Sequence, residues 1–176
     1  MTLILAVDVY YRDGGAVAAG VMFDDWSADS IEACYLSAIA QVSPYRPGRF
    51  YQRELPCSLT LLSEHKLVPD TIIIDGYVYL DGVSIPGLGR YLYDALQGRV
   101  VIIGVAKKPF IGIAARHRVL RGSSHNPLYI TAAGMQLAVA KKLIRSMHGK
   151  YRIPTLLKLA DQSSRGKCRG EYNRYD

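Results

Sequence analysis

The sequence predicts one α/β domain with a mixed sheet, and three observations support this fold class. The 176 residues have the length of a single domain, and 49% hydrophobic with 21% charged residues is an ordinary globular mixture. Residues 3–39 hold three apolar runs separated by short polar turns, the pattern of an antiparallel meander. Later, two wholly apolar runs flank a helical segment, which indicates parallel pairing.

The N-terminal third is expected to be the meander. Its strands are residues 3–11, 16–23 and 31–39. The first turn, residues 12–15, contains Asp-Gly-Gly, and these residue types tolerate the positive φ of a tight hairpin. Residues 24–27 form the second turn. Short polar turns of this kind join neighbouring antiparallel strands.

The middle of the chain is expected to alternate loops, helices and buried strands. A loop over residues 43–51 precedes a helix over residues 56–66, opened by its proline and closed by a basic pair. Residues 71–75 and 100–106 are buried strands, and residues 88–96 between them form a helix. This order predicts one βαβ unit.

The last third is expected to be helical. Residues 131–147 give the clearest helical pattern, because apolar residues recur at spacings of three and four. A last short helix covers residues 154–159, with Asp161 at or just past its end. We therefore expect a single domain over residues 1–161 and a basic, flexible tail over residues 162–176.

Cysteines and hydropathy indicate a cytoplasmic protein. The three cysteines stand far apart without a CxxC pair, and their odd number argues against a secreted disulfide framework. The apolar N-terminal run has no basic segment before it and is interrupted by Asp8, so we expect no signal peptide. No apolar run approaches the about 20 residues that a membrane helix needs, so we expect no membrane partner. The oligomeric state is not predicted.

Charge is unevenly distributed along the chain. Residues 1–94 contain twelve Asp or Glu and six Lys or Arg, whereas residues 95–160 contain twelve Lys or Arg and no acid. A generally solvated basic surface is one interpretation. Solubility alone does not easily explain such a long stretch without a compensating acid, so we favour a surface that binds DNA or RNA beside an acidic pocket.

Three acidic residues stand where a metal site would need them. Asp8 interrupts an apolar strand, Asp75 ends another, and Glu54 lies between a proline-rich loop and a helix. A carboxylate on a core strand is costly unless it is paired or binds a metal. Oxygen ligands favour Mg²⁺ or Mn²⁺, and Mg²⁺ between carboxylates and phosphate is common in phosphodiester chemistry. The spacing alone equally allows Asp8 to face solvent and Asp75 to cap a turn.

One lysine is expected beside these carboxylates. Lys107 directly follows the second buried strand, so it should lie at the same rim of the sheet as Asp75. There it could hold a phosphate or stabilise developing negative charge. Taken in isolation, an ordinary surface lysine is the more common case.

Five segments resemble the endonuclease V family, in the family's order and over nearly the whole chain. They are Ala-Val-Asp-Val-Tyr-Tyr at residues 6–11, Pro-Tyr-Arg-Pro-Gly at 44–48 with Arg-Glu-Leu-Pro at 53–56, the stretch 70–76 ending in Asp-Gly, Gly-Val-Ala-Lys at 104–107, and Tyr-Arg-Ile-Pro at 151–154 leading to Leu-Ala-Asp-Gln-Ser at 159–163. The second and fourth are the most specific. The resemblance implies a ribonuclease-H-like fold, in which a three-strand antiparallel meander precedes parallel βα units.

The resemblance also implies an activity. It predicts a Mg²⁺-dependent endonuclease, with Mn²⁺ able to replace Mg²⁺, that hydrolyses phosphodiester bonds of DNA or RNA near deaminated adenine (inosine). Matched residue by residue, Asp8, Glu54 and Asp75 are the expected metal ligands. Lys107 matches the family's active-site lysine, and Asp161 matches a further residue near the metal.

Substrate-binding residues follow from the same resemblance. Pro44, Tyr45, Arg46 and Pro47 match a wedge loop that inserts beside the lesion and holds the strands apart. An aromatic ring between two prolines is a stiff stacking platform, which agrees with that role. Gly76 and Tyr77 are expected at the base pocket.

Three positions depart from the family's usual pattern. Val78 stands where a pocket-lining glycine is usual, while Asp81 and Met135 each replace a usual histidine. A glycine lets a base approach closely, and an added carboxylate should repel phosphate or recruit a second metal, so we predict weak discrimination for inosine. A catalytically weak or inactive nucleic-acid-binding protein on the same fold is the alternative. The basic stretch and the wedge loop disfavour a small-molecule phosphohydrolase.

Overall fold

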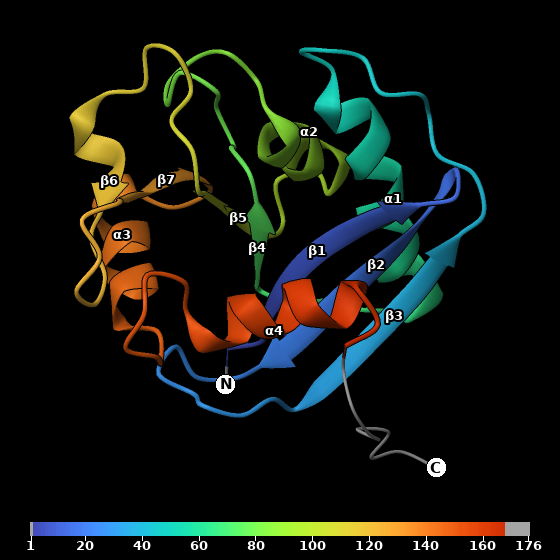
Figure 1. Ribbon diagram of the computed structural model, residues 1–176, viewed down its shortest axis with the longest axis horizontal. Helices are drawn as coiled ribbons and strands as arrows, with labels where there is room; N and C mark the ends of the chain where they lie inside the picture. The colour runs from blue at the N-terminus through green and yellow to red at the C-terminus, as the bar shows by residue number, and fades with distance from the viewer. Residues whose placement is uncertain (1, 168–176) are drawn as a thin grey trace.

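A central sheet of seven strands, covered by helices on both faces, forms the computed structural model, which describes residues 2–167 (Figure 1). The strand order is β3-β2-β1-β4-β5-β7-β6. The strands are β1 (Ile4–Arg12), β2 (Gly15–Phe23), β3 (Ala33–Ile39), β4 (Thr71–Asp75), β5 (Val101–Ala106), β6 (Arg118–Val119) and β7 (Leu128–Ala133). The helices are α1 (Phe50–Glu64), α2 (Leu88–Ala95), α3 (Leu137–Ser146), α4 (Thr155–Ser164) and the short 3₁₀ helix η1 (Ala115–His117).

The N-terminal meander is confirmed. β1 pairs antiparallel with β2, and β2 pairs antiparallel with β3. In the first turn Asp13 and Gly14 have φ of 53° and 78°, the left-handed backbone that the sequence of this turn favours. β3 begins at Ala33, slightly later than predicted.

Parallel strands form the centre of the sheet and set the position of the site. β4 pairs parallel with both β1 and β5, and Val7 lies opposite Ile74. Asp8 and Asp75 are the next residues on these two strands, and Lys107 directly follows β5. Because parallel strands present their carboxyl ends at one edge of a sheet, these three side chains gather there.

The helix predicted over residues 131–147 is wrong in its first part. Residues 128–133 are β7, which pairs antiparallel with β5, and α3 begins only at Leu137. Gly134, at φ 78°, lies between the two elements. The apolar residues at the end of β7 continue those of α3 at helical spacing, so periodicity alone does not separate the strand from the helix. The sheet therefore ends in antiparallel pairs, and parallel pairing is confined to β1, β4 and β5.

Helix α1 begins earlier than predicted. It starts at Phe50, so Pro56 lies inside the helix instead of opening it. Proline is usual in the first turn, where its missing N–H is not needed, and this preference misplaced the boundary. Glu54 consequently lies on the helix itself, and is buried, instead of preceding it.

Helix α4 extends further than predicted. It runs to Ser164, so Asp161 lies within it, and the predicted domain boundary at residue 162 falls inside a helix. Both Ser163 and Ser164 are buried. The remainder of the predicted tail, residues 168–176, lies outside the described residues.

Two apolar cores fill the two faces of the sheet. Leu61 of α1 and Leu92 of α2 belong to one core, and Ile144 of α3 and Leu156 of α4 belong to the other. In Figure 1, α4 crosses in front of β1 and β2, and it packs against both. No helix within residues 2–167 is long and apolar enough to cross a membrane.

Candidate active site at the carboxyl ends of β1, β4 and β5

Four of the five residues predicted to carry the chemistry line one hollow. Asp8 on β1, Asp75 on β4, Lys107 after β5 and Asp161 on α4 border a cavity of about 340 Å³. Glu54, on α1, does not line it, but its carboxylate is close enough to feel the negative charges of Asp8 and Asp75. The fold thus brings all five together around one edge of the sheet.

Asp8 is a buried carboxylate with a hydrogen-bond donor on α4. Only 9% of the residue is exposed, and the Ser164 hydroxyl donates to Asp8 Oδ2 over 2.7 Å. Burial raises the pKa of Asp8, and the negative charges of Asp75 and Asp161 raise it further. A cation bound at this carboxylate would therefore offset both the cost of burying its charge and its repulsion by Asp75 and Asp161.

Glu54 is the most deeply buried acid of the site. It is 5% exposed, and its Oε2 atom has no hydrogen-bond partner among residues 2–167. Burial, followed by the charges of Asp8 and Asp75, raises its pKa well above the ordinary value. The nearby Arg53 charge and Tyr11 hydroxyl lower this pKa without outweighing these effects. A buried carboxylate oxygen without a partner is costly, and a bound cation is one way to satisfy it.

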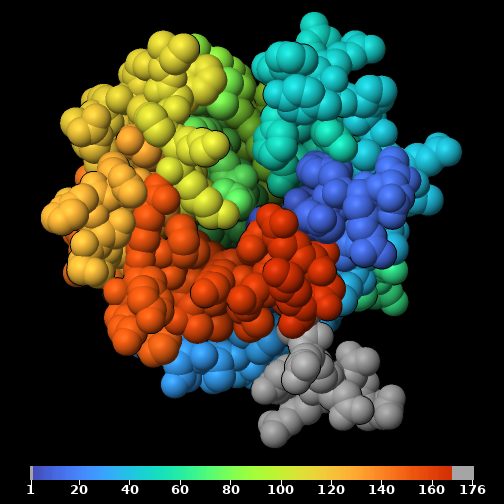
Figure 2. Space-filling model, viewed as in Figure 1, coloured from blue at the N-terminus to red at the C-terminus, as the bar shows by residue number. Residues whose placement is uncertain are grey.

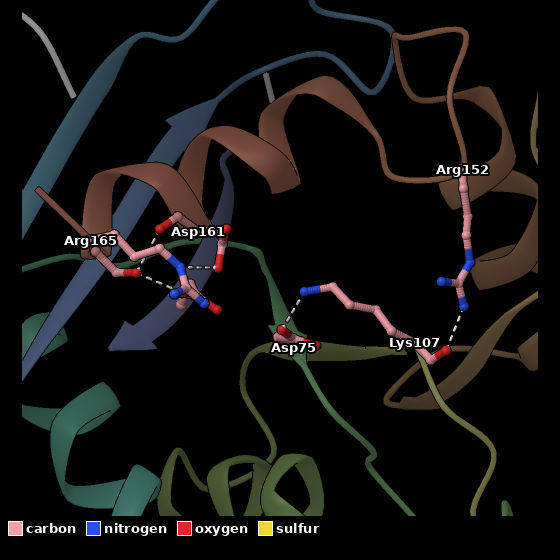
Figure 3. Close-up of polar contacts among 7 residues, drawn as sticks. Asp75, Lys107, Arg152, Asp161 and Arg165 are labelled. Carbon is pink, nitrogen blue, oxygen red and sulfur yellow. Dashed lines mark hydrogen bonds and ion pairs between the residues drawn. The ribbon is translucent and has the colours of Figure 1, made fainter. Parts of the chain in front are cut away.

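Asp75 and Lys107 form an ion pair at the sheet edge. Lys107 Nζ lies 2.7 Å from Asp75 Oδ2, and both side chains are about 40% exposed (Figure 3). Burial opposes the positive charge of Lys107, but the hydrogen bond to Asp75 and the charges of Asp75, Asp8 and Asp161 outweigh it and raise the lysine pKa. Lys107 therefore stays charged where an anionic substrate would arrive.

Asp161 occupies the side of the hollow formed by α4. Its Oδ1 atom lies 2.9 Å from Arg165 Nε one turn later (Figure 3). The Arg165 guanidinium also lies over the Tyr10 ring, 4.8 Å from its centre. The negative charge of Asp161 acts on the carboxylate of Asp8, whose pKa it raises.

The donor set of the site suits a divalent cation. The atoms that could bind a metal are carboxylate oxygens, which suit Mg²⁺ or Mn²⁺. Among them, the buried Glu54 Oε2 has no hydrogen-bond partner in the described part of the chain. Within residues 2–167, however, no three His, Cys, Asp or Glu side chains are arranged as a ready set of ligands. Lys107 takes one oxygen of Asp75 and Ser164 takes one of Asp8. The donor chemistry fits a divalent cation, provided that these side chains turn toward it.

A second hollow lies beside the first. Its volume is about 550 Å³, and Asp75 and Lys107 border it as they border the first hollow. Gly76 and Tyr77, the residues predicted to bind substrate, form part of its wall, and Phe110 adds an aromatic ring. A Cβ on Gly76, at φ 148°, would meet no atom within 4 Å, so the space beside this glycine is open.

Tyr77 joins two segments of the wall of the second hollow by hydrogen bonds. Its hydroxyl donates to the Lys108 carbonyl over 2.7 Å and accepts from the Phe110 N–H over 3.1 Å. The Tyr77 and Phe110 rings meet edge to face, 6.4 Å between centres. The loop after β5 is therefore tied to the segment after β4.

The predicted wedge residues lie in an exposed loop at this side of the molecule. Pro44, Tyr45, Arg46 and Pro47 are all exposed, and 62% of Tyr45 is accessible. The loop leads through Gly48, which lines the second hollow, into α1. Its position allows contact with a substrate strand that enters this hollow.

Two of the departures noted in the sequence have structural roles away from the hollows. Val78 is fully buried, packs toward Gly89 of α2 and does not line the second hollow. The Ser84 hydroxyl, followed by the N–H groups of Ile85, Ser84 and Val83, donates hydrogen bonds to Asp81 and holds its pKa well below the ordinary value. The Asp81 carboxylate thus caps its own loop.

Part of the basic stretch serves the fold. Arg121 is 5% exposed and donates to the carbonyls of Met147, Gly149, Tyr151 and Arg152. Other members of the stretch also bond carbonyls: Arg152 donates to Lys107 and Pro127, and Lys141 donates to Arg116. For these three cations, backbone carbonyls accept the hydrogen bonds that acidic side chains would otherwise accept. This explains in part why the basic stretch contains no acidic residue.

Sequence reasoning missed Ser164 and Arg121. Ser164 falls in the predicted tail. It stands three residues after Asp161, however, and continuing the last helix past Asp161 places both residues on one face. Arg121 gave no local signal, because its partners lie 26 to 31 residues away.

Comparisons with known proteins agree with the resemblance seen in the sequence. The Endonuclease V family model matches residues 1–123. Endonuclease V of Azotobacter vinelandii is 32% identical over 183 aligned positions, covering 91% of this chain and 80% of that protein. Endonuclease V of Xylella fastidiosa is 28% identical over 145 positions, covering 81% of this chain but only 58% of that protein.

Solved structures give the same match to the fold. Endonuclease V of Streptomyces avermitilis is 28% identical, with a TM-score of 0.74 over 94% of this chain and 81% of that chain. Ciona intestinalis Endonuclease V, bound to a DNA that contains an inosine, has a TM-score of 0.76 at 20% identity, covering 94% of this chain and 85% of that chain. Endonuclease V structures have the ribonuclease-H-like fold, which confirms the predicted fold class.

Proposed function

The chain belongs to the endonuclease V family, and on that premise we propose that Asp8, Glu54 and Asp75 hold a divalent cation for the hydrolysis of a phosphodiester bond. Family membership makes the chain a nuclease and implies a divalent metal cofactor. The observation that carries the residue assignment is the buried Oε2 of Glu54, which has no hydrogen-bond partner within residues 2–167 and lies near the charges of Asp8 and Asp75.

Mg²⁺ is the proposed cation, with Mn²⁺ able to replace it, because the donors are oxygens alone. When bound, such a cation lowers the pKa of a coordinated water and stabilises negative charge on the phosphate. Asp161 would support the site from α4, since its charge already acts on Asp8. Ser164 would orient Asp8 through the hydrogen bond to Oδ2.

Lys107 is proposed to bind the scissile phosphate. Its ammonium group is paired with Asp75 at 2.7 Å and lies where the two hollows meet. If Asp75 turns to a cation, the ammonium group is released toward an incoming phosphate. A positioned cation of this kind stabilises charge that develops in the transition state.

The proposed substrate is DNA or RNA with a deaminated base such as inosine. A relative from Ciona intestinalis binds inosine-containing DNA, and the second hollow here, beside the exposed Tyr45 loop, is roomy enough for a flipped base. Val78 and Asp81, which led us to predict weak discrimination for inosine, do not obstruct this hollow. We propose a cytoplasmic location, consistent with three scattered cysteines.

Cleavage of matched oligonucleotides tests this proposal. Strands with and without one inosine are incubated with Mg²⁺, with Mn²⁺ and with a chelator. We expect metal-dependent cleavage, and a preference of about a hundredfold, roughly 2.7 kcal/mol, would show that the base pocket discriminates.

Asp75→Asn provides the residue-level test. It should abolish cleavage while leaving nucleic acid binding unchanged or tighter, because a negative charge is removed beside the phosphate. Asp29→Asn, at an exposed position outside both hollows, is the matched control and should cleave normally. Full cleavage by Asp75→Asn would refute the assignment.

A further inference from the structure

The two hollows of the site meet at one pair of residues. Among residues 2–167, Asp75 and Lys107 alone line both hollows. The second hollow extends from this pair toward Tyr77 and Phe110, and the first extends toward α4 and the segment before it. A phosphate bound at Lys107 would therefore have a hollow on each side.

The packing of the helices explains why the first hollow exists. On this face of the sheet, α4 packs on β1, β2 and β3, while α3 packs on β7. The carboxyl ends of β4 and β5 lie between these two helices, and Ile73 and Val105 form an apolar floor there. Figure 2 shows the surface hollowed between α4 and the loop after β5. The floor is left without a helix above it.

The outer wall of this hollow is held rigidly in place. It consists of the segment 147–154, from which Tyr151, Arg152 and Ile153 line the hollow. The buried guanidinium of Arg121 donates to four carbonyls of this segment. Arg152 in turn donates to the carbonyls of Lys107 and Pro127, which joins the wall to the end of β5 (Figure 3). Hydrogen bonds from Arg121 and Arg152 therefore tie this wall to its neighbours in the fold.

The rim of the hollow suits a nucleotide. Lys158, on the first turns of α4, is exposed at the rim, so its charge is available to a phosphate. Tyr151 is 66% exposed, with Lys150 Nζ 5.4 Å from the centre of its ring. An apolar floor, an exposed aromatic ring and an exposed cation are the features with which proteins bind a base and its phosphate.

We propose that this hollow binds the nucleotide on the far side of the scissile phosphate from the base held in the second hollow. The proposal rests on the proposed function, since it takes the phosphate at Lys107 as the point of cleavage. A polynucleotide is continuous, so a strand whose phosphate lies at Lys107 must extend into both hollows or away from the surface. The volume of about 340 Å³ lies within the usual range of ligand pockets.

Single-turnover cleavage tests the proposal. The cleavage position is first mapped with the unmodified chain, and the nucleotide beyond it is then replaced by an abasic unit. We expect the rate to fall about tenfold, which is about 1.4 kcal/mol. Leu157→Trp, which fills the hollow, should slow the intact substrate by a similar factor but leave the abasic substrate unaffected, because the two changes remove one interaction.

Control variants separate the hollow from general charge and from misfolding. Lys158→Ala should weaken binding of the intact strand several-fold. Arg99→Ala, which removes a cation at the opposite end of β5, should not. The melting temperature of Leu157→Trp shows whether the variant folds. If Leu157→Trp slows both substrates equally, or the abasic unit has no effect, the hollow does not bind this nucleotide.

Fluorescence gives a readout that does not depend on catalysis. A strand with 2-aminopurine at this position, titrated with the unmodified chain in chelator, should change its fluorescence on binding, and Leu157→Trp should remove the change. If the chain does not cleave any strand, the proposed function fails, whereas this titration still decides whether the hollow takes a base. An unchanged signal at saturation would overturn the proposal.

Discussion

Glu54 is the residue whose surroundings most directly indicate a cation site. A glutamate that is 5% exposed, with a partnerless Oε2, destabilises the fold unless something else balances it. Its pKa is raised well above the ordinary value by burial and by the charges of Asp8 and Asp75. The folded state therefore binds a proton at Glu54 more tightly than the unfolded state does.

This pKa shift predicts how stability depends on pH without metal. An acid with a raised pKa favours folding while it is protonated, so the stability is fully present below the unfolded pKa of about 4.3 and is lost as pH rises through the raised folded value. Glu54→Gln stays neutral and should melt at a higher temperature than the parent chain, by an amount that grows with pH over this window. Each 1 kcal/mol corresponds to about 2–4 °C for a chain of this size.

Melting temperatures measured in chelator at several pH values check this prediction. A second set of measurements adds the divalent cation. At a hundredfold excess over Kd, a cation should stabilise the parent chain by about 2.7 kcal/mol, and Glu54→Gln should lose most of that gain. Glu64→Gln, at the exposed end of the same helix, is the control. A Glu54→Gln chain that melts below the parent in chelator would contradict the assignment.

The gathering of the candidate site residues at one edge of the sheet could be predicted from sequence, but the contacts between them could not. Asp8, Asp75 and Lys107 stand at strand positions that the apolar pattern defines, so their meeting at one edge followed from parallel pairing. The direction of the Asp81 side chain depends on hydrogen bonds within its own loop, and that of Val78 depends on packing against α2. No sequence pattern shows either. Val78 faces the core, and Asp81 faces its own loop.

At the scale of elements, the errors share one cause, which is that tertiary burial overrides local signals. Residues 131–133 have helical spacing with the residues of α3, yet they pair with β5 because a central strand needs a second neighbour. Pro56 favours a helix start, yet α1 begins at Phe50. Ser164 lies in a Ser- and Gly-rich stretch, yet it is buried against Asp8. In each case tertiary packing, and not the local sequence, decides where the helix or strand begins or ends.

Arg121 leads to a prediction about an element, the segment 147–154. Hydrogen bonds from a charged donor contribute about 1.5–3 kcal/mol each, reduced here by the cost of burying the guanidinium. Arg121→Met would leave one buried and three partly buried carbonyls without this donor, so we expect a loss of about 2–4 kcal/mol in the free energy of unfolding, measured by urea denaturation. Arg118→Ala, at an exposed position nearby, should change stability by less than about 0.5 kcal/mol. Equal stability of the Arg121→Met and parent chains would show that water replaces the guanidinium.

At the scale of the whole molecule, the formal charge of +7 overstates the cations available to a nucleic acid. Arg121, Arg152 and Lys141 donate to backbone carbonyls, and Arg165 is paired with Asp161. Cations that remain exposed around the two hollows include Lys108, Lys150 and Lys158, whereas Lys107 is paired with Asp75. The sequence showed the basic stretch correctly, but only the structure separates cations that hold the fold from those that face solvent.

That separation predicts the salt dependence of binding. Three phosphate contacts on a single strand should give a slope near roughly −2 in a plot of log binding constant against log salt, because each contact releases about 0.7 of a counterion. Fluorescence anisotropy with a labelled strand in chelator, between about 50 and 200 mM salt, measures this slope. Lys158→Ala should make it shallower by about 0.7, whereas Arg99→Ala, at the far end of β5, should leave it unchanged. A flat plot for the parent chain would mean that the exposed lysines do not contact the backbone. Equal slopes for the Lys158→Ala and Arg99→Ala chains would mean that the strand does not follow the rim of α4.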